Sequence, residues 1–107
     1  MSSPAEDLRA IIRSETRVRP VPGLEAIRLH LADDVWSLWR KLQARRGAPG
    51  QPPFWAFPWA GGQGLARYVL EHPEVVRGER VLDFASGSGL VGIAAMTAGA
   101  ASCLCTD

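Results

Sequence analysis

A stretch near the end of this 107-residue chain constrains its fold more than any other. Val81 and Leu82, which are typical of a buried strand, lead into the acid Asp83, then into a turn of very small side chains, then into an apolar run that lasts until Gly99. Glycine and alanine in the turn let the backbone bend sharply and approach a ligand closely. A strand, a small-residue turn and an apolar helix in this order predict the start of a nucleotide-binding βαβ unit.

The residues after the turn complete this unit. Apolar side chains from Leu90 to Met96 repeat at helical spacing, which predicts a helix whose first N–H groups point into the same crevice as the turn. A second strand-like run from Ala101 to Thr106 ends on Asp107. This acid lies about 20 residues beyond the turn, the spacing at which a carboxylate reaches the ribose hydroxyls of a bound nucleoside.

The nature of the ligand depends on Asp83. The residues from Gly87 to Gly92 also match the dinucleotide pattern G-x-G-x-x-G, so a fragment of an NAD(P)- or FAD-binding oxidoreductase stays open. However, an acid this close to Gly87 would repel a diphosphate and attract a sulfonium or an ammonium. The unit also follows about 80 residues of other structure, whereas dinucleotide domains commonly open a chain. We therefore favour S-adenosylmethionine, with a noncatalytic remnant that docks onto another protein as a further alternative.

Two segments carry a family resemblance. The run from Val81 to Gly89 resembles the first motif of class I methyltransferases, and the aromatic segment from Pro53 to Gln63 resembles the segment before it in one branch. That branch is the seven-β-strand protein-lysine methyltransferases typified by the electron transfer flavoprotein β-subunit lysine methyltransferase, with bacterial members labelled nicotinamide N-methyltransferase-like. The resemblance covers about Glu25 to Asp107. It implies S-adenosylmethionine as cofactor and a lysine side chain of a protein partner as acceptor, here an electron transfer flavoprotein β-subunit-like protein.

The resemblance also implies a set of cofactor-binding residues. Those at the turn would surround the methionine part of the cofactor, the last acid would bind the ribose, and the residues from Trp59 to Gln63 would line the cofactor's near side. The expected residues are Trp59, Gly62, Gln63, Asp83, Ala85, Ser86, Gly87, Gly89 and Asp107. Ala85 departs from the family, which mostly carries glycine there. No catalytic residue is assigned, because the residues that orient the acceptor would lie downstream of Asp107.

We predict an α/β fold with a Rossmann-like class I methyltransferase sheet, truncated after its second strand and preceded by an N-terminal α+β extension. Residues 1–53 would form the extension, and residues 54–107 the incomplete start of the S-adenosylmethionine-binding domain. A parallel sheet of two strands leaves its edges unpaired and its faces poorly covered. We therefore expect the chain to be the N-terminal portion of an enzyme and not to turn over substrate as it stands.

The first part of the extension is expected to hold a helix and a strand. Ser3, Pro4 and Glu6 have the spacing of a capping box with proline at the first helical position. The two prolines and the glycine between positions 19 and 23 prevent this helix from continuing. Apolar residues then alternate with polar ones over positions 25–31, which predicts a half-exposed strand.

The aromatic residues fall on two kinds of segment. Helical spacing from Val35 to Leu42, after a cap at Asp33 or Asp34, predicts a second helix with Trp36 and Trp39 in the core. A linker over positions 47–53 follows. Trp55 and Trp59 lie among prolines on a loop, where they can wall off a pocket. A third helix is predicted from Gly64 to Glu71, opened by Gln63.

Composition narrows the class of protein only a little. Twelve Lys and Arg residues against 11 Asp and Glu residues give a net charge of +1, so nothing indicates a nucleic acid or an anionic membrane as partner. The polar, acidic start is typical neither of a secretory signal nor of a transit peptide, and we expect a cytoplasmic protein. Cys103 and Cys105 share one face of a predicted strand. We expect them to be reduced and not to bind a metal.

Overall fold

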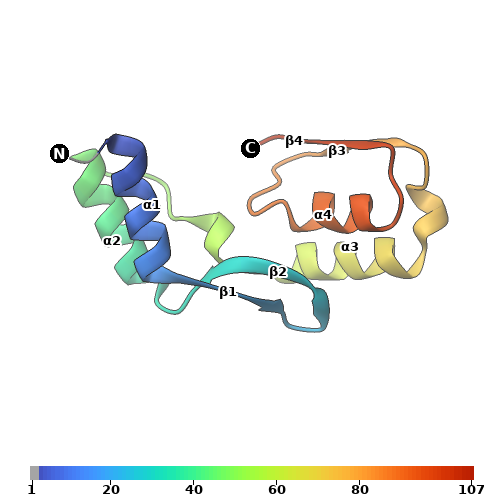
Figure 1. Cartoon of the computed structure of the whole chain (residues 1–107), viewed down its shortest axis with the longest axis horizontal. Coiled ribbons are helices and arrows are strands. Elements are labelled where there is room, and N and C mark those ends of the chain that lie inside the picture. Colours follow the sequence, from blue (N-terminus) through green and yellow to red (C-terminus); the bar gives the residue numbers. More distant parts are fainter. Residues whose placement is uncertain (1–2) are drawn as a thin grey trace.

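The computed structural model describes residues 3–107. The first half of the chain contains two helices joined by a hairpin, and the chain ends in a small parallel sheet (Figure 1). Helix α1 (Pro4–Glu15) starts at the predicted capping box: Ser3 Oγ accepts a hydrogen bond from Glu6 N at 3.2 Å, and Glu6 Oε2 accepts one from Ser3 N at 2.8 Å. Helix α2 (Val35–Arg46) lies beside α1 and is capped by Asp34 rather than Asp33. Each helix therefore begins at a side chain that satisfies its free N–H groups.

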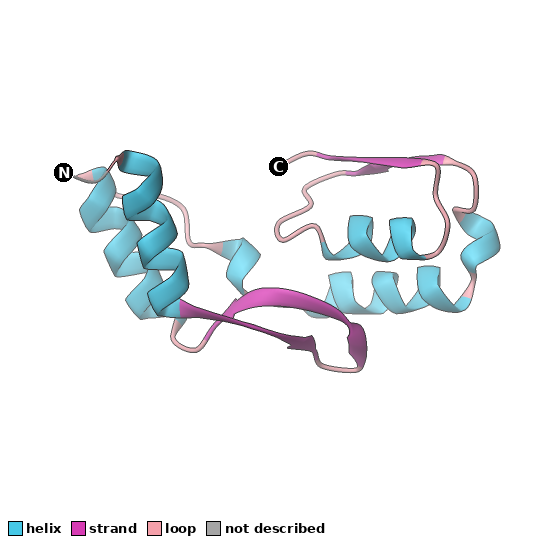
Figure 2. Ribbon diagram, viewed as in Figure 1, coloured by secondary structure: helices cyan, strands magenta, loops and turns pink. Residues whose placement is uncertain are grey.

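A β-hairpin joins these two helices (Figure 2). Strand β1 (Thr16–Val21) pairs antiparallel with strand β2 (Leu24–Ala32), with Thr16 opposite Ala32. The predicted strand at 25–31 is confirmed: Ile27, Leu29 and Leu31 are buried, while the alternating Arg28 and His30 are exposed. Strand β1 was not predicted, because its prolines indicated only a helix end. Pro20 fits because a two-stranded hairpin leaves every strand one free edge, where no N–H donor is required.

The second half of the chain alternates helices and strands. Its regular elements are η1 (Phe54–Ala56), α3 (Ala60–Glu71), η2 (Pro73–Val75), β3 (Arg80–Asp83), α4 (Leu90–Thr97) and β4 (Ser102–Cys105). Strands β3 and β4 are parallel, with Asp83 opposite Cys105, as a βαβ unit requires. The predicted strands and the helix between them are confirmed. Helix α3 starts at Ala60 and not at Gly64, so Gln63 lies in its first turn.

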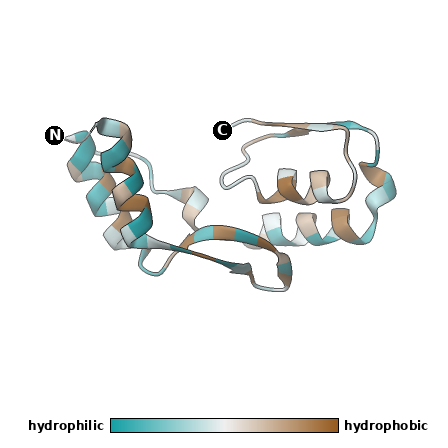
Figure 3. Ribbon diagram, in the orientation of Figure 1, coloured by the Kyte–Doolittle hydropathy of each residue, from teal (hydrophilic) through white to brown (hydrophobic). Residues whose placement is uncertain are grey.

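The core lies where the hairpin meets α3 and α4, and these two helices lie between the hairpin and the parallel sheet (Figures 1 and 3). Buried side chains of the hairpin pack in one cluster with those of both helices. The cluster consists of Val21, Leu24, Ile27, Leu29, Leu31, Ala66, Val69, Val76, Leu90, Ala94, Ala95 and Ala100. One apolar cluster thus draws on residues from both sides of position 53. The chain is a mixed α/β structure with two small sheets.

Two burial predictions were wrong. The residues before the glycine turn were expected to form a buried strand, but Leu82 is 59 % exposed and its partner in the register, Leu104, is 65 % exposed. Helix α4 covers only one face of the sheet, so side chains on the other face meet solvent. Trp36 was expected in the core but is 66 % exposed on α2. Within residues 3–107, no helix has the length and apolar character needed to cross a membrane.

Candidate functional site

The turn between β3 and α4 is held in an unusual backbone conformation. Ala85, Gly87 and Gly89 all have positive φ angles, of 55°, 55° and 84°. Ala85 is the one non-glycine residue with a positive φ in the part of the chain that the structure describes. A side chain in this region costs about 1–2 kcal/mol, which explains why glycine is the ordinary residue at this position. The turn therefore keeps its backbone accessible to a ligand, and the left-handed conformation of Ala85 makes this backbone strained.

Hydrogen bonds tie the turn to the end of β4. Ser86 N donates to Thr106 O at 2.8 Å, and Thr106 N donates to Asp83 O at 3.0 Å. Gly87 N also points to Asp107 Oδ1 at 3.4 Å. The acid expected to bind a ribose therefore lies against the glycine turn, at the carboxyl ends of two adjacent parallel strands. Ligands of open α/β sheets bind at this edge.

Asp83 is the buried acid of the site, with 8 % of its surface exposed. Its Oδ2 accepts a hydrogen bond from Gly92 N in the first turn of α4 at 2.9 Å. Helix α4 begins at Leu90, and the N-cap residue before it, Gly89, has no side chain to cap it. Asp83 therefore supplies from the neighbouring strand the carboxylate that a helix N-terminus favours. This structural contact was not foreseen from the sequence.

The aromatic segment faces the turn across a cavity. Trp59 is 53 % exposed, its Nε1–H donates to Phe54 O at 2.9 Å, and its ring lies 5.0 Å from that of Phe57. Gly62 stands on α3, where an added Cβ would meet Leu90 at 3.8 Å. The loop therefore presents an aromatic wall that is fixed by its own contacts.

The cavity has a volume of about 470 Å³ and brings most of the predicted site residues together. Its walls come from the aromatic loop, the first turn of α3 and the glycine turn. The lining residues are Phe54, Phe57, Pro58, Trp59, Gly61, Gly62, Leu65, Asp83, Phe84, Ala85, Ser86, Gly87, Ser88, Leu90, Val91 and Asp107. Such a volume is that of an ordinary small-molecule site. The size and the two acids at one edge fit a nucleoside that carries a cation.

Two predicted site residues, Gln63 and Gly89, do not line this cavity. The side-chain amide of Gln63 donates to Pro58 O, so it holds the aromatic loop against α3. Gly89 accommodates the positive φ at the start of α4. Conversely, Phe54 and Phe57 line the cavity but were not predicted as site residues from the sequence. Their position among prolines, the same signal that singled out Trp59, would have found them.

We expect Trp59→Ala to weaken ligand binding more than it lowers stability. The exposed ring contributes little to the core, whereas stacking of a base on an aromatic ring contributes about 1–3 kcal/mol, which is roughly 5- to 150-fold in affinity. The measurements are the dissociation constant of S-adenosylhomocysteine and the melting temperature. Trp36→Ala is the matched control, since Trp36 is also exposed and does not line the cavity. Equal losses of affinity and stability in Trp59→Ala would indicate packing alone.

The two cysteines lie under the helix that follows the turn. An ideal Cβ at Gly92 would lie 2.9 Å from Cys105 Sγ and 3.0 Å from Cys103 Sγ, so both sulfurs face this glycine. Both are free thiols, as expected. Burial, together with the neighbouring Cys105 thiol, raises the pKa of Cys103 above its usual value of 9.0. In the described part of the chain, no group of three or more potential ligand side chains gathers to hold a metal.

The raised pKa of Cys103 predicts slow alkylation. Only the thiolate reacts, and a pKa above 9.0 leaves a smaller thiolate fraction at pH 8 than an unperturbed cysteine has. In a Cys105→Ser variant, Cys103 should therefore react with iodoacetamide more slowly in the folded chain than in urea. The difference should shrink as the pH rises. Equal rates in the folded and the unfolded chain at pH 8 would contradict the burial of this thiol.

Comparison with known proteins shows that the chain is similar in sequence to lysine methyltransferases. It is 39 % identical over 99 residues to a protein of Xenopus laevis, a match that covers 92 % of this chain and 39 % of that protein. It is 51 % identical over 59 residues to a protein of Rattus norvegicus, covering 55 % of this chain and 23 % of the relative. Both relatives are named electron transfer flavoprotein beta subunit lysine methyltransferase.

A protein of Caenorhabditis elegans named as a homologue of the same lysine methyltransferase is 37 % identical to the chain over 81 residues. The resemblance identified from the turn and the aromatic segment is thus confirmed. The frog match covers more of the chain than the stretch from Glu25 onward that the motifs indicated. The chain spans about two fifths or less of the length of these relatives. No protein-family model and no solved structure matches it.

Proposed function

We propose that this chain forms the methyl-donor site of an S-adenosylmethionine-dependent protein-lysine methyltransferase. The observation that carries the proposal is the cavity at the carboxyl edge of the parallel sheet, where Asp83 and Asp107 meet around the glycine turn. Two carboxylates and an open backbone turn are complementary to a nucleoside that carries an ammonium and a sulfonium. The same two carboxylates repel a diphosphate. The similarity to named lysine methyltransferases supports this choice over an oxidoreductase.

Each proposed donor contact has a basis in the geometry. Asp83 keeps a second carboxylate oxygen for the donor's ammonium, because only Oδ2 is bound to Gly92 N. Asp107 takes the ribose hydroxyls, with Ala85, Ser86 and Gly87 close to the methionine part. Trp59 and Gly62 line the near side. Gln63 and Gly89 act through the loop and the turn that they hold, as positioning residues.

When bound, the donor supplies an electrophilic methyl group on its sulfonium. Methyl transfer is an in-line displacement, so this chain's contribution is to hold the donor in a fixed orientation and to limit its contact with water. The acceptor lysine must also lose its proton, which desolvation favours. We propose a lysine of an electron transfer flavoprotein β-subunit-like protein as acceptor, because the relatives bear that name. None of the described residues is assigned to its orientation.

The finer structural proposals follow from the same reasoning. We propose that β3 and β4 are the first strands of a Rossmann-like sheet in residues 54–107, and that residues 1–53 form an extension whose hairpin completes the core. The exposed outer face of β3 and β4 supports further structure on that side of the sheet. We also propose a cytoplasmic location, for which the two free thiols of Cys103 and Cys105 are the support.

Photolabelling tests the donor site. Ultraviolet irradiation of the chain with methyl-labelled S-adenosylmethionine should attach label within residues 54–62 or at the glycine turn. Unlabelled S-adenosylhomocysteine should compete, and NADH should not. Label that NADH removes and S-adenosylhomocysteine does not would favour the dinucleotide alternative. Label spread over α1 and α2 would contradict the site.

A chimera tests the acceptor. The chain replaces the matching segment of the Xenopus laevis enzyme, and label from S-adenosylmethionine is followed onto lysines of the flavoprotein β subunit. We expect transfer by the chimera and its loss in the chimera with Asp83→Asn. A folded chimera that binds S-adenosylhomocysteine but labels no lysine would contradict the acceptor while leaving the donor site intact.

A further inference from the structure

A second cavity, of about 340 Å³, adjoins the glycine turn on the side of the hairpin. Two of its lining residues, Gly87 and Ser88, also line the proposed donor site. The others come from the hairpin and its surroundings: Ile12, Arg28, Leu29, His30 and Trp55. The turn is thus shared by the donor site and by a space whose far wall is strand β2. A group that extends from the donor past the turn would enter this space.

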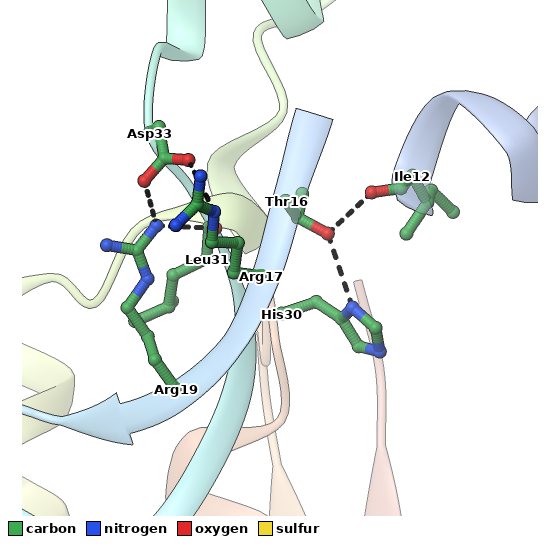
Figure 4. Close-up of polar contacts among 7 residues, drawn as sticks. All are labelled: Ile12, Thr16, Arg17, Arg19, His30, Leu31 and Asp33. Atoms are coloured by element: carbon green, nitrogen blue, oxygen red, sulfur yellow. Dashed lines mark hydrogen bonds and ion pairs between the residues drawn. The ribbon is translucent and has the colours of Figure 1, made fainter. Parts of the chain in front are cut away.

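Arg28 is the one charged side chain among the residues that line this second cavity. Its situation differs from that of the two arginines on the partner strand. Arg19 donates to Asp33, and Arg17 Nε lies 3.3 Å from Asp33 Oδ2, so one carboxylate pairs with both (Figure 4). The Arg19 hydrogen bond lowers the pKa of Asp33. Across residues 3–107 the structure gives Arg28 no such carboxylate, so its guanidinium is free to bind an anion.

The neutral ring of His30 cannot donate to an anion in this cavity. Thr16 Oγ1 lies 2.6 Å from Ile12 O and 3.2 Å from His30 Nδ1 (Figure 4). A carbonyl only accepts, so the single hydroxyl proton goes to Ile12, and His30 Nδ1 must be the donor to Thr16. In the neutral ring Nε2 then carries no proton and cannot donate to an anion. Arg28 is left as the charged donor in the cavity, with the Ser88 hydroxyl as a neutral one.

We propose that Arg28 binds the carboxylate of the methyl donor's amino-acid part, and so selects a nucleoside that carries an α-carboxylate. This inference rests on the proposed donor site. Asp83 would then bind the ammonium of the donor's amino-acid part from the strand side of the turn. Arg28 would bind its carboxylate from the hairpin side. A guanidinium binds a carboxylate through two parallel hydrogen bonds, which gives geometric selectivity as well as affinity. The hairpin of the extension thereby becomes part of donor recognition.

The test compares two ligands in two arginine variants by NMR titration of the chain. One ligand is S-adenosylhomocysteine, and the other is its decarboxylated analogue. We expect Arg28→Gln to lower the affinity for S-adenosylhomocysteine about tenfold and to leave the affinity for the analogue unchanged. Arg40→Gln, an exposed change of equal charge on α2, should affect neither. The wild-type chain should prefer the carboxylated ligand by about the same factor.

The outcomes separate this inference from the proposed function. The proposed role of Arg28 is wrong, and the donor site stands, in either of two cases. In the first, Arg28→Gln binds S-adenosylhomocysteine with wild-type affinity; in the second, its affinities for both ligands fall by the same factor. If neither ligand shifts any signal at the glycine turn of the wild-type chain, the donor site and the inference are both overturned. The backbone spectrum of each variant verifies that it is folded.

Discussion

Replacing Asp83 by alanine should remove both donor binding and a large part of the stability of this small chain. The buried carboxylate accepts the hydrogen bond of Gly92 N at 2.9 Å. Its loss leaves a buried donor unsatisfied, which costs about 1–3 kcal/mol, and leaves α4 without a cap. At about 0.05–0.15 kcal/mol per residue, a chain of 107 residues has a stability of roughly 5–16 kcal/mol, so a loss of this size is a substantial fraction of it. Urea unfolding should therefore show a clearly lower midpoint.

Asp83→Asn separates the two roles of this residue. The amide oxygen of asparagine can still accept from Gly92 N, so stability should fall by less than in Asp83→Ala. The negative charge is lost in both variants, so both should bind S-adenosylhomocysteine at least tenfold more weakly, as expected for a charge-assisted hydrogen bond. If the asparagine variant keeps wild-type affinity, Asp83 is a helix cap and no more.

Gly92→Ala is the second change with a large expected effect. Alanine is favoured over glycine inside a helix by about 1 kcal/mol, so propensity alone predicts stabilisation. The added Cβ would instead lie 2.9 Å from Cys105 Sγ, 3.0 Å from Cys103 Sγ and 3.2 Å from Asp83 Oδ2. Overpacking of this kind costs about 1–3 kcal/mol. Urea unfolding should show net destabilisation, and donor affinity should fall because Asp83 is displaced.

Two further variants make this prediction sharp. Gly64→Ala is the matched control, because Gly64 lies in α3 and a Cβ added there would meet nothing within 4 Å. This control should be stabilising by up to about 1 kcal/mol. Replacing both cysteines by alanine in the Gly92→Ala background should restore most of the lost stability. Destabilisation that persists without the two sulfurs would show that they are not the cause.

Local patterns accounted for much of the fold. The capping box at Ser3 and the alternation over residues 25–31 each involve neighbours in sequence, and both predictions are confirmed. Strand β1 was missed because Pro20 disfavours a strand locally, while pairing with β2 outweighs that preference. The start of α3 was missed because glycines at positions 61, 62 and 64 lower helix propensity. The exposure of Trp36 depends on what packs beside α2, which no local pattern contains.

The candidate site divides in the same way. The sharp turn was predicted from its small residues, and positive φ angles at Gly87 and Gly89 agree with it, while the distance in sequence from the turn to Asp107 was read as that of a βαβ unit. The bond from Gly92 to Asp83 could not be predicted, because it depends on how deeply α4 packs against β3. The proximity of Arg28 to the turn joins residues about 60 positions apart. It needs the three-dimensional placement of the hairpin.

The central claim is that the glycine turn and its two acids bind a methyl donor and not a dinucleotide. Titration of the ¹⁵N-labelled chain with S-adenosylhomocysteine and, separately, with NADH tests it most directly. We expect S-adenosylhomocysteine to shift the amide signals of Gly87 and Ser88 and the indole signal of Trp59, and NADH to leave all three in place. Shifts at these positions with NADH, and none with S-adenosylhomocysteine, would contradict the account.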